Sequence, residues 1–172
     1  MGLRYDNIPK RNKKGWENIV GELKTYKDFA DNDTEYLVAA IEAGIRGNRM
    51  GAEAQEACEK YLKHIIDKYF TAETPEENED KSRWLKSHNL HTLVNKVAQC
   101  GICIPDDLKS DILKVDGYYF STRCPGDNAY TMQEHDIHTC FKAVSNTKAF
   151  VEDLEREING YDGHDEPDYE CL

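Results

Sequence analysis

The sequence predicts an all-α protein, folded as an antiparallel up-and-down bundle of four to five main helices. Between residues 16 and 159 the apolar residues recur every three or four positions, which is the spacing of one helix face. The alternation of β-branched and polar residues that is typical of strands is missing. Most apolar stretches are joined by short connections, and helices joined in this way pack as antiparallel neighbours.

The 172 residues suffice for one domain, which we expect over residues 16–159. Residues 1–15 are expected to form a flexible basic arm, and residues 160–172 an acidic disordered tail. The basic residues of the arm are Lys10, Arg11, Lys13 and Lys14. No apolar run approaches the roughly 20 residues that span a bilayer, and no signal peptide is evident. We therefore expect a cytoplasmic protein with no membrane contact.

The first half of the bundle is expected to hold two helices. Asp33 or Thr34 caps the first helix, which ends at Gly47. Its apolar stripe consists of Leu37, Ile41 and Ile45. The second helix runs from about 48 to 70. Its apolar face consists of Ala54, Cys58, Tyr61, Leu62, Ile65, Ile66 and Tyr69. A short amphipathic segment at 16–23, with Trp16, Ile19, Val20 and Leu23, is expected to pack against this pair.

The second half is expected to hold three helices. Residues 71–83 contain Pro75 and no periodic apolar residue, so we predict an exposed loop there. A third helix starts at Ser87 or His88 and stops near Gly101. Pro105 starts a fourth, which continues through Tyr119 until the segment RCPGDN breaks it. The last helix starts at Thr131, where Thr131 and Glu134 have the spacing of a capping box, and runs to about Ile158.

Three sequence pieces occur in a particular order on this frame. The second helix reads AEAQEACEKYLKHII, the third opens with SHNLHTLV, and the fourth leads into GYYFSTRCPGD. With the capped last helix, these pieces resemble the HEPN family (higher eukaryotes and prokaryotes nucleotide-binding) over residues 28–158. The similarity depends on Gln55, Glu59, Lys60 and Lys63, on the step from Ser87 to Leu90, and on the step from Tyr118 to Gly126.

The resemblance implies a dimeric helical bundle that acts as a nucleotide-binding module, as a metal-independent ribonuclease, or as the partner of a nucleotidyltransferase in a toxin–antitoxin pair. The ribonucleases of the family look similar at the start of the last helix, where an Arg is followed after four to six residues by a His. Arg123 matches the Arg, but Asn128, Ala129 and Tyr130 occupy the His positions. The imidazole that would act as general acid or base in a ribonuclease is therefore missing, which argues against an enzyme.

The leading candidate site is a pocket for a phosphate-bearing ligand, a nucleotide or an RNA segment. Its residues are Lys60, Lys63, His88, Tyr119 and Arg123. Lys60 and Lys63 share a helix face, and a guanidinium at a helix end can hold a phosphate bidentately. The alternative is that Arg123 forms an ion pair with Glu59, while both lysines extend into solvent. The net charge of −11 argues against a broad electrostatic surface for nucleic acid.

Metal binding by paired histidines is a second hypothesis. The two His-x-x-His pairs are His88 with His91 and His135 with His138. Two such pairs could meet around Zn²⁺, although capping and surface positions are the alternative. The six cysteines are expected to be reduced thiols. No Gly-rich phosphate loop or nucleophile elbow is present, and we expect no cofactor. Two alternatives to a binding module stay open: a ribonuclease in which His88 or His135 substitutes, and a pure interaction subunit.

Overall fold

The computed structural model describes residues 23–160, and every regular element in this range is a helix. The helices are α1 (Tyr26–Glu42), α2 (Arg49–Tyr69), α3 (Pro75–Leu85), α4 (Leu90–Gln99), α5 (Asp106–Lys114), α6 (Tyr118–Ser121) and α7 (Glu134–Gly160). The all-α prediction is therefore confirmed. The predicted amphipathic segment at 16–23 lies outside the described residues except for Leu23, as do the predicted arm and nearly all of the tail.

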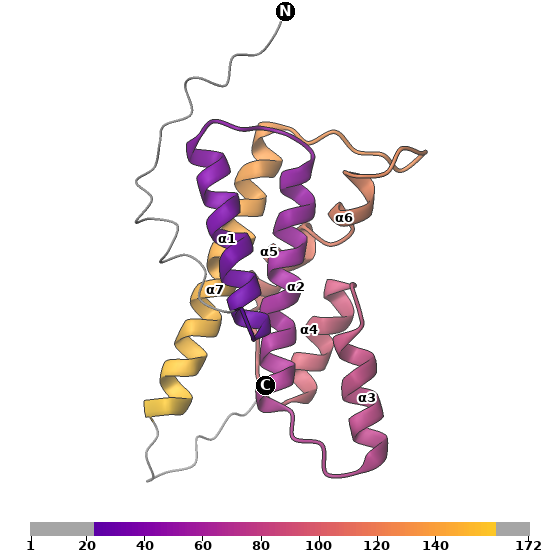
Figure 1. The fold of residues 1–172 in the computed structure, drawn as a ribbon, viewed down its shortest axis with the longest axis vertical. Coiled ribbons are helices and arrows are strands. Elements are labelled where there is room, and N and C mark those ends of the chain that lie inside the picture. Colours follow the sequence, from indigo (N-terminus) through magenta and orange to yellow (C-terminus); the bar gives the residue numbers. More distant parts are fainter. Residues whose placement is uncertain (1–22, 161–172) are drawn as a thin grey trace, which may run out of the picture.

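Helix α2 lies at the centre of the molecule and packs against α1, α3, α4, α6 and α7 (Figure 1). Its middle turns are buried almost completely around, because Tyr61, Leu62, Ile65 and Ile66 are all inaccessible to solvent. Ile112 from α5 and Val144 and Val151 from α7 join the same core. The predicted bounds of α2 are accurate to one residue at each end.

Helix α1 begins well before the predicted cap at Asp33 or Thr34, so that prediction is wrong. Thr25 is the true N-cap: its hydroxyl accepts from the Asp28 amide at 3.2 Å, and the Asp28 carboxylate accepts from the Thr25 amide at 2.8 Å. Asp31 and Asp33 suit a cap by propensity, but they lie inside the helix because they bind partners on other helices. The helix ends before Gly44, and Ile45 is exposed.

Helix α3 occupies most of the segment that was predicted to be an exposed loop. Thr74 and Glu77 form a capping box, and Pro75 takes the first helical position, where a missing N–H costs nothing. No residue of α3 is fully buried, which is why apolar periodicity could not reveal it. Only its end contacts the core, where Trp84 packs edge-on against Phe70 with 4.9 Å between ring centroids.

The predicted fourth helix is divided in two by Gly117. The glycine has φ +86°, a left-handed conformation that other residues avoid, and it ends α5 before the short α6 begins. The last helix begins at Glu134 rather than at Thr131, and the predicted capping box does not form. Instead, the Asp136 carboxylate accepts from the Gln133 amide at 2.7 Å. None of the helices between residues 23 and 160 combines the length and the apolar character needed to cross a membrane.

Candidate functional site

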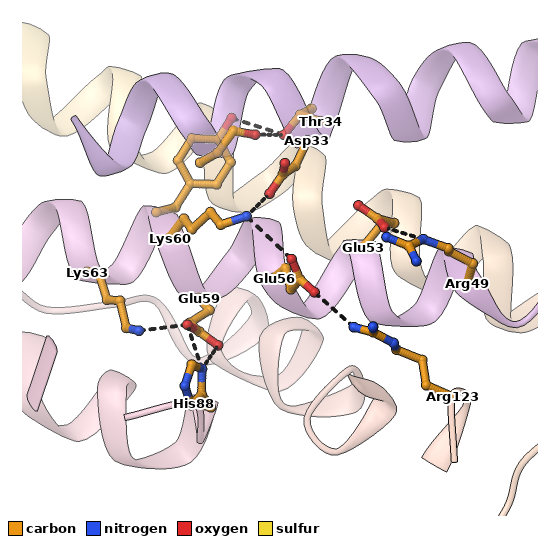
Figure 2. A network of polar contacts seen from close by, with 12 residues as sticks. Asp33, Thr34, Arg49, Glu53, Glu56, Glu59, Lys60, Lys63, His88 and Arg123 are labelled. Carbon is orange, nitrogen blue, oxygen red and sulfur yellow. Dashed lines mark hydrogen bonds and ion pairs between the residues drawn. The ribbon is translucent and has the colours of Figure 1, made fainter. Parts of the chain in front are cut away.

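One face of α2 carries the polar residues around which the candidate site is built (Figure 2). Glu56 and Lys60 lie one helical turn apart, as do Glu59 and Lys63, so the four side chains form two neighbouring rows on α2. The loop before α4 supplies His88, α6 supplies Tyr119, and the loop after α6 supplies Arg123. The fold therefore brings His88, Tyr119 and Arg123 to α2 beside these carboxylates, whereas Lys60 faces α1.

His88 is anchored by a buried carboxylate. Its Nδ1 lies 3.1 Å from Oε1 and 3.2 Å from Oε2 of Glu59. The Nζ of Lys63 donates to the same Oε1 at 2.7 Å. The side chains of Glu59 and Lys63 are 9% and 6% exposed, whereas that of His88 is 72% exposed. Since Nδ1 is engaged, the imidazole presents Nε2 as its remaining polar atom.

Gln55 ties the two outer elements of the site to α2. Its Nε2 donates to the carbonyl of His88 at 3.1 Å, and its Oε1 accepts from the amide of Tyr119 at 2.7 Å. The residue is only 2% exposed. One buried amide side chain therefore fixes the loop that carries His88 and the helix that carries Tyr119, so their relative position is determined by α2.

Arg123 binds Glu56, the carboxylate one helical turn before Glu59 on α2. Its guanidinium contacts Oε1 of Glu56 at 3.5 Å and covers the ring of Tyr119 with 4.5 Å between the guanidinium carbon and the ring centroid. The expected alternative, an ion pair with Glu59, is wrong because Lys63 and His88 occupy that carboxylate. The expectation that both lysines extend into solvent is also wrong for Lys63, which is buried.

Lys60 faces away from His88, toward α1. Its Nζ binds the carboxylate of Asp33 and lies 3.5 Å from Oε2 of Glu56. Burial alone would lower the pKa of Lys60, but the hydrogen bond and the charge of Asp33 raise it, so the side chain stays positively charged. The arrangement links α1, α2 and Arg123 in one chain of ion pairs, in which Glu56 is shared by Lys60 and Arg123.

The segment between α6 and α7 is held in place by the carboxylate of Asp136. It accepts from the hydroxyl of Tyr130 at 2.8 Å and contacts the hydroxyl of Tyr118 at 3.5 Å. Burial and then the negative charge of Asp136 raise the pKa of Tyr118 to about 12, so its hydroxyl stays protonated and can donate. Asn48 also accepts from the amide of Met132 at 2.9 Å. These bonds hold the chain that follows Arg123.

An aromatic surface lies beside Arg123. Phe120 is 61% exposed, and its ring meets that of Tyr119 edge-on with 5.1 Å between centroids. An exposed Phe has no hydrogen-bonding role, and Phe120 lies against Tyr119, whose ring the Arg123 guanidinium covers, so a flat ring could stack there.

The charges of the site are balanced within the protein. The carboxylates of Asp33, Glu56 and Glu59 pair with Lys60, Lys63 and Arg123, and Glu59 also holds His88. Lys63 is buried under its carboxylate, whereas His88 and Arg123 reach the surface. An anion would therefore meet the outward side of His88 and Arg123, and Arg123 could exchange its long contact to Glu56 for a shorter one to phosphate.

The histidines that were considered as metal ligands do not converge. Within residues 23–160, no three side chains of His, Cys, Asp or Glu lie close enough to hold a metal ion. His91, His135 and His138 are exposed, and His135 lies beside Asp136 at 3.3 Å. The two His-x-x-His pairs therefore form no shared site in this part of the chain. The described cysteines form no disulfide.

Gln55 and Glu56 are the residues whose roles sequence reasoning missed. Gln55 was noted only as part of a family pattern, yet a polar amide between Ala54 and Ala57 on a helix that buries its small residues indicates an internal hydrogen-bond partner.

Comparison of the chain with protein-family models, with curated proteins and with solved structures found no match.

Proposed function

We propose that this protein is a binding or regulatory module that holds a phosphate-bearing ligand, a nucleotide or an RNA segment, on the surface formed by His88, Tyr119 and Arg123. One observation carries the proposal: two carboxylates of α2 that lie one helical turn apart, Glu59 and Glu56, bind an exposed imidazole and an exposed guanidinium. In this function Arg123 donates to phosphate, the Nε2 of His88 adds a hydrogen bond, and Tyr119 supports the guanidinium. Lys63 and Lys60 keep the two carboxylates in place.

A thermal-shift experiment tests this proposal with nucleoside mono-, di- and triphosphates and short RNAs, with and without EDTA. A ligand that binds only the folded state raises the melting temperature. We expect a rise that Arg123→Ala removes while the melting temperature of the free protein changes little, because exposed ion pairs contribute only about 0–1 kcal/mol.

Arg83→Ala is the matched control, since Arg83 is an exposed arginine on α3 that pairs with Asp80. Its removal should leave the ligand-induced shift intact. If none of the nucleotides or RNAs shifts the wild-type protein, the binding proposal is wrong and the chain is better explained as an interaction subunit.

Ribonuclease activity is the second candidate, and the anchoring of His88 favours it. A buried carboxylate that fixes one imidazole nitrogen while the other faces solvent is the arrangement of a general acid or base. His88 would take the proton of a ribose 2′-hydroxyl as its oxygen attacks the phosphorus and Arg123 stabilises the phosphate charge. The P–O5′ bond would break, the leaving 5′-oxygen would take a proton from water, and a 2′,3′-cyclic phosphate would remain. We then expect RNA cleavage in EDTA that His88→Asn abolishes and His91→Asn, at an exposed position on α4, does not.

The homodimer and the nucleotidyltransferase partner stay predictions from the family resemblance. Light scattering of the purified protein measures the first. Co-purification with a partner expressed alongside tests the second, and an inert monomer would contradict both.

A further inference from the structure

A pocket of about 310 Å³ lies between the α4–α5 connection and the last turns of α7, and none of its lining residues belongs to the candidate site. Phe150, Leu154 and Ile158 follow each other at four-residue intervals on α7, so they form one apolar row along the pocket. Ile102 and Pro105 line it from the connection. The surface that the pocket offers to a ligand is therefore mostly apolar.

The depth and the size of the pocket suit a small apolar group. Leu154 is 8% exposed and belongs to the core, whereas Ile158 is 41% exposed and lies at the surface. A ligand would remove the exposed part of Ile158 from water, which is favourable in proportion to the apolar area that is buried. Small-molecule sites have volumes of about 300–1,000 Å³, and this pocket lies at the lower end of that range. Its ligand should therefore be compact, with roughly one or two rings.

The charged residues of the lining are acidic. They are Asp153 and Glu157, and no Lys, Arg or His is among the described residues that line the pocket. Asp153 is paired with Arg156 one turn away, whereas Glu157 forms no ion pair within residues 23–160. Glu157 is therefore the carboxylate that is available to a ligand. An ammonium group would complement its charge, whereas an anion would be repelled.

We propose that this pocket binds a compact apolar amine, with the ammonium group at Glu157 and the apolar body against Phe150, Leu154 and Ile158. Two other occupants fit the charge less well. A second copy of the protein in a two-fold contact would bring a second Glu157 to the first, and like charges placed together are unfavourable. Residues 161–172, which follow α7 in the chain, contain Asp and Glu but no Lys or Arg, so the same repulsion applies to them.

Tryptamine is the probe for this proposal, with tryptophol as its neutral isostere and indole-3-propionate as its anionic counterpart. NMR signals of the isoleucine δ1 methyl groups, assigned by single Ile→Val substitutions, report binding in the full-length protein. We expect tryptamine to shift the signals of Ile102 and Ile158 saturably and to leave that of Ile45, which lies outside the lining, in place. The dissociation constant of tryptophol should be about threefold to tenfold higher, because it lacks the charge that pairs with Glu157, and that of indole-3-propionate higher still.

Two substitutions locate the bound amine. Glu157→Gln should make tryptamine and tryptophol bind equally, whereas Glu35→Gln, at an exposed position on α1, should leave the difference between them unchanged. Ile158→Lys should abolish binding as measured at Ile102, because it removes apolar surface and places a cation beside the site of the ammonium group. Ile45→Lys is the matched control at another exposed isoleucine and should bind tryptamine as the wild-type protein does.

Three results would overturn the proposal. The first is that neither tryptamine nor tryptophol shifts the signals of Ile102 and Ile158, or that tryptophol binds the wild-type protein as tightly as tryptamine does. The second is a tryptamine-induced shift that Ile158→Lys leaves unchanged, which would place the probe elsewhere. The third is movement of these signals when the protein is diluted without a probe, together with a dimer mass, which would assign the pocket to a second copy.

Discussion

At the scale of residues, the site depends on polar groups that α2 buries. Glu59 is 7% exposed and Gln55 is 2% exposed, so each must find partners inside the protein. Glu59 finds Lys63 and His88, and Gln55 finds the backbone of two other elements. The buried groups therefore determine the positions of the exposed groups of the site. Binding should therefore be sensitive to substitutions that never touch a ligand.

Gln55→Leu tests how much the buried hydrogen bonds of Gln55 stabilise the protein. The variant replaces the amide with an apolar side chain of similar length and leaves the Tyr119 amide without its acceptor. We therefore expect a loss of about 1–3 kcal/mol in the free energy of unfolding. Urea unfolding measures the loss. Gln99→Leu, at an exposed position in the last turn of α4, should change the stability by less than about 0.5 kcal/mol. Equal effects of both variants would show that the Gln55 bonds contribute little.

At the scale of elements, α6 approaches α2 closely at a glycine. A Cβ added to Gly51 would lie 2.6 Å from Sδ of Met132 and 3.1 Å from side-chain carbons of Thr122 and Tyr118. The methionine can move, but the other two carbons belong to α6 and the residue that follows it, so α6 would have to shift. Glycine at this position therefore permits the contact that places Tyr119 and Arg123.

Gly51→Ala should destabilise the protein, although alanine favours a helix by about 1 kcal/mol over glycine. Overpacking in a buried contact costs roughly 1–3 kcal/mol, so we expect a net loss in thermal stability together with weaker ligand binding. Gly47→Ala is the control, because nothing lies within 4 Å of the added Cβ there. A stabilised Gly51→Ala variant would mean that α6 moves without cost.

At the scale of the whole molecule, one buried and one half-buried carboxylate join helices to one another. The carboxylate of Asp111 on α5 holds Lys142 of α7 at 2.9 Å and Asn146 at 3.2 Å. The carboxylate of Asp31 on α1 holds Lys148 of α7 and accepts from the hydroxyl of Tyr61 on α2. Burial alone would raise the pKa of both carboxyls, but the hydrogen bonds from lysine lower it in each case.

These lowered pKa values predict that the fold weakens in acid. Between the folded and the unfolded pKa the unfolded chain binds more protons, so stability rises with pH in that window. The contribution is complete above the unfolded value of about 4 and is lost as pH falls through the folded value. Urea unfolding at several pH values between about 7 and 2 measures this loss.

Asp111→Asn should lower the stability at neutral pH and reduce the loss below about pH 4, since one of the titrating groups is gone. Asp127→Asn, at an exposed loop position, serves as the control and should follow the wild-type curve. If Asp111→Asn and the wild-type protein lose the same free energy in acid, the Asp111 cluster does not contribute to the pH dependence.

The sequence by itself determined the helical class, the bounds of α2 and the end of α4 near Gly101, because apolar periodicity and a left-handed glycine are local properties. It could not place the start of α1 or find α3 from apolar spacing, since Asp31 and Asp33 are helical through distant partners and α3 buries no whole residue. Tertiary packing alone settled which carboxylate the cations of the other elements bind: His88 joins Lys63 on Glu59, and Arg123 takes Glu56. Pairings between elements depend on how helices pack, and packing joins residues that no spacing along the chain relates.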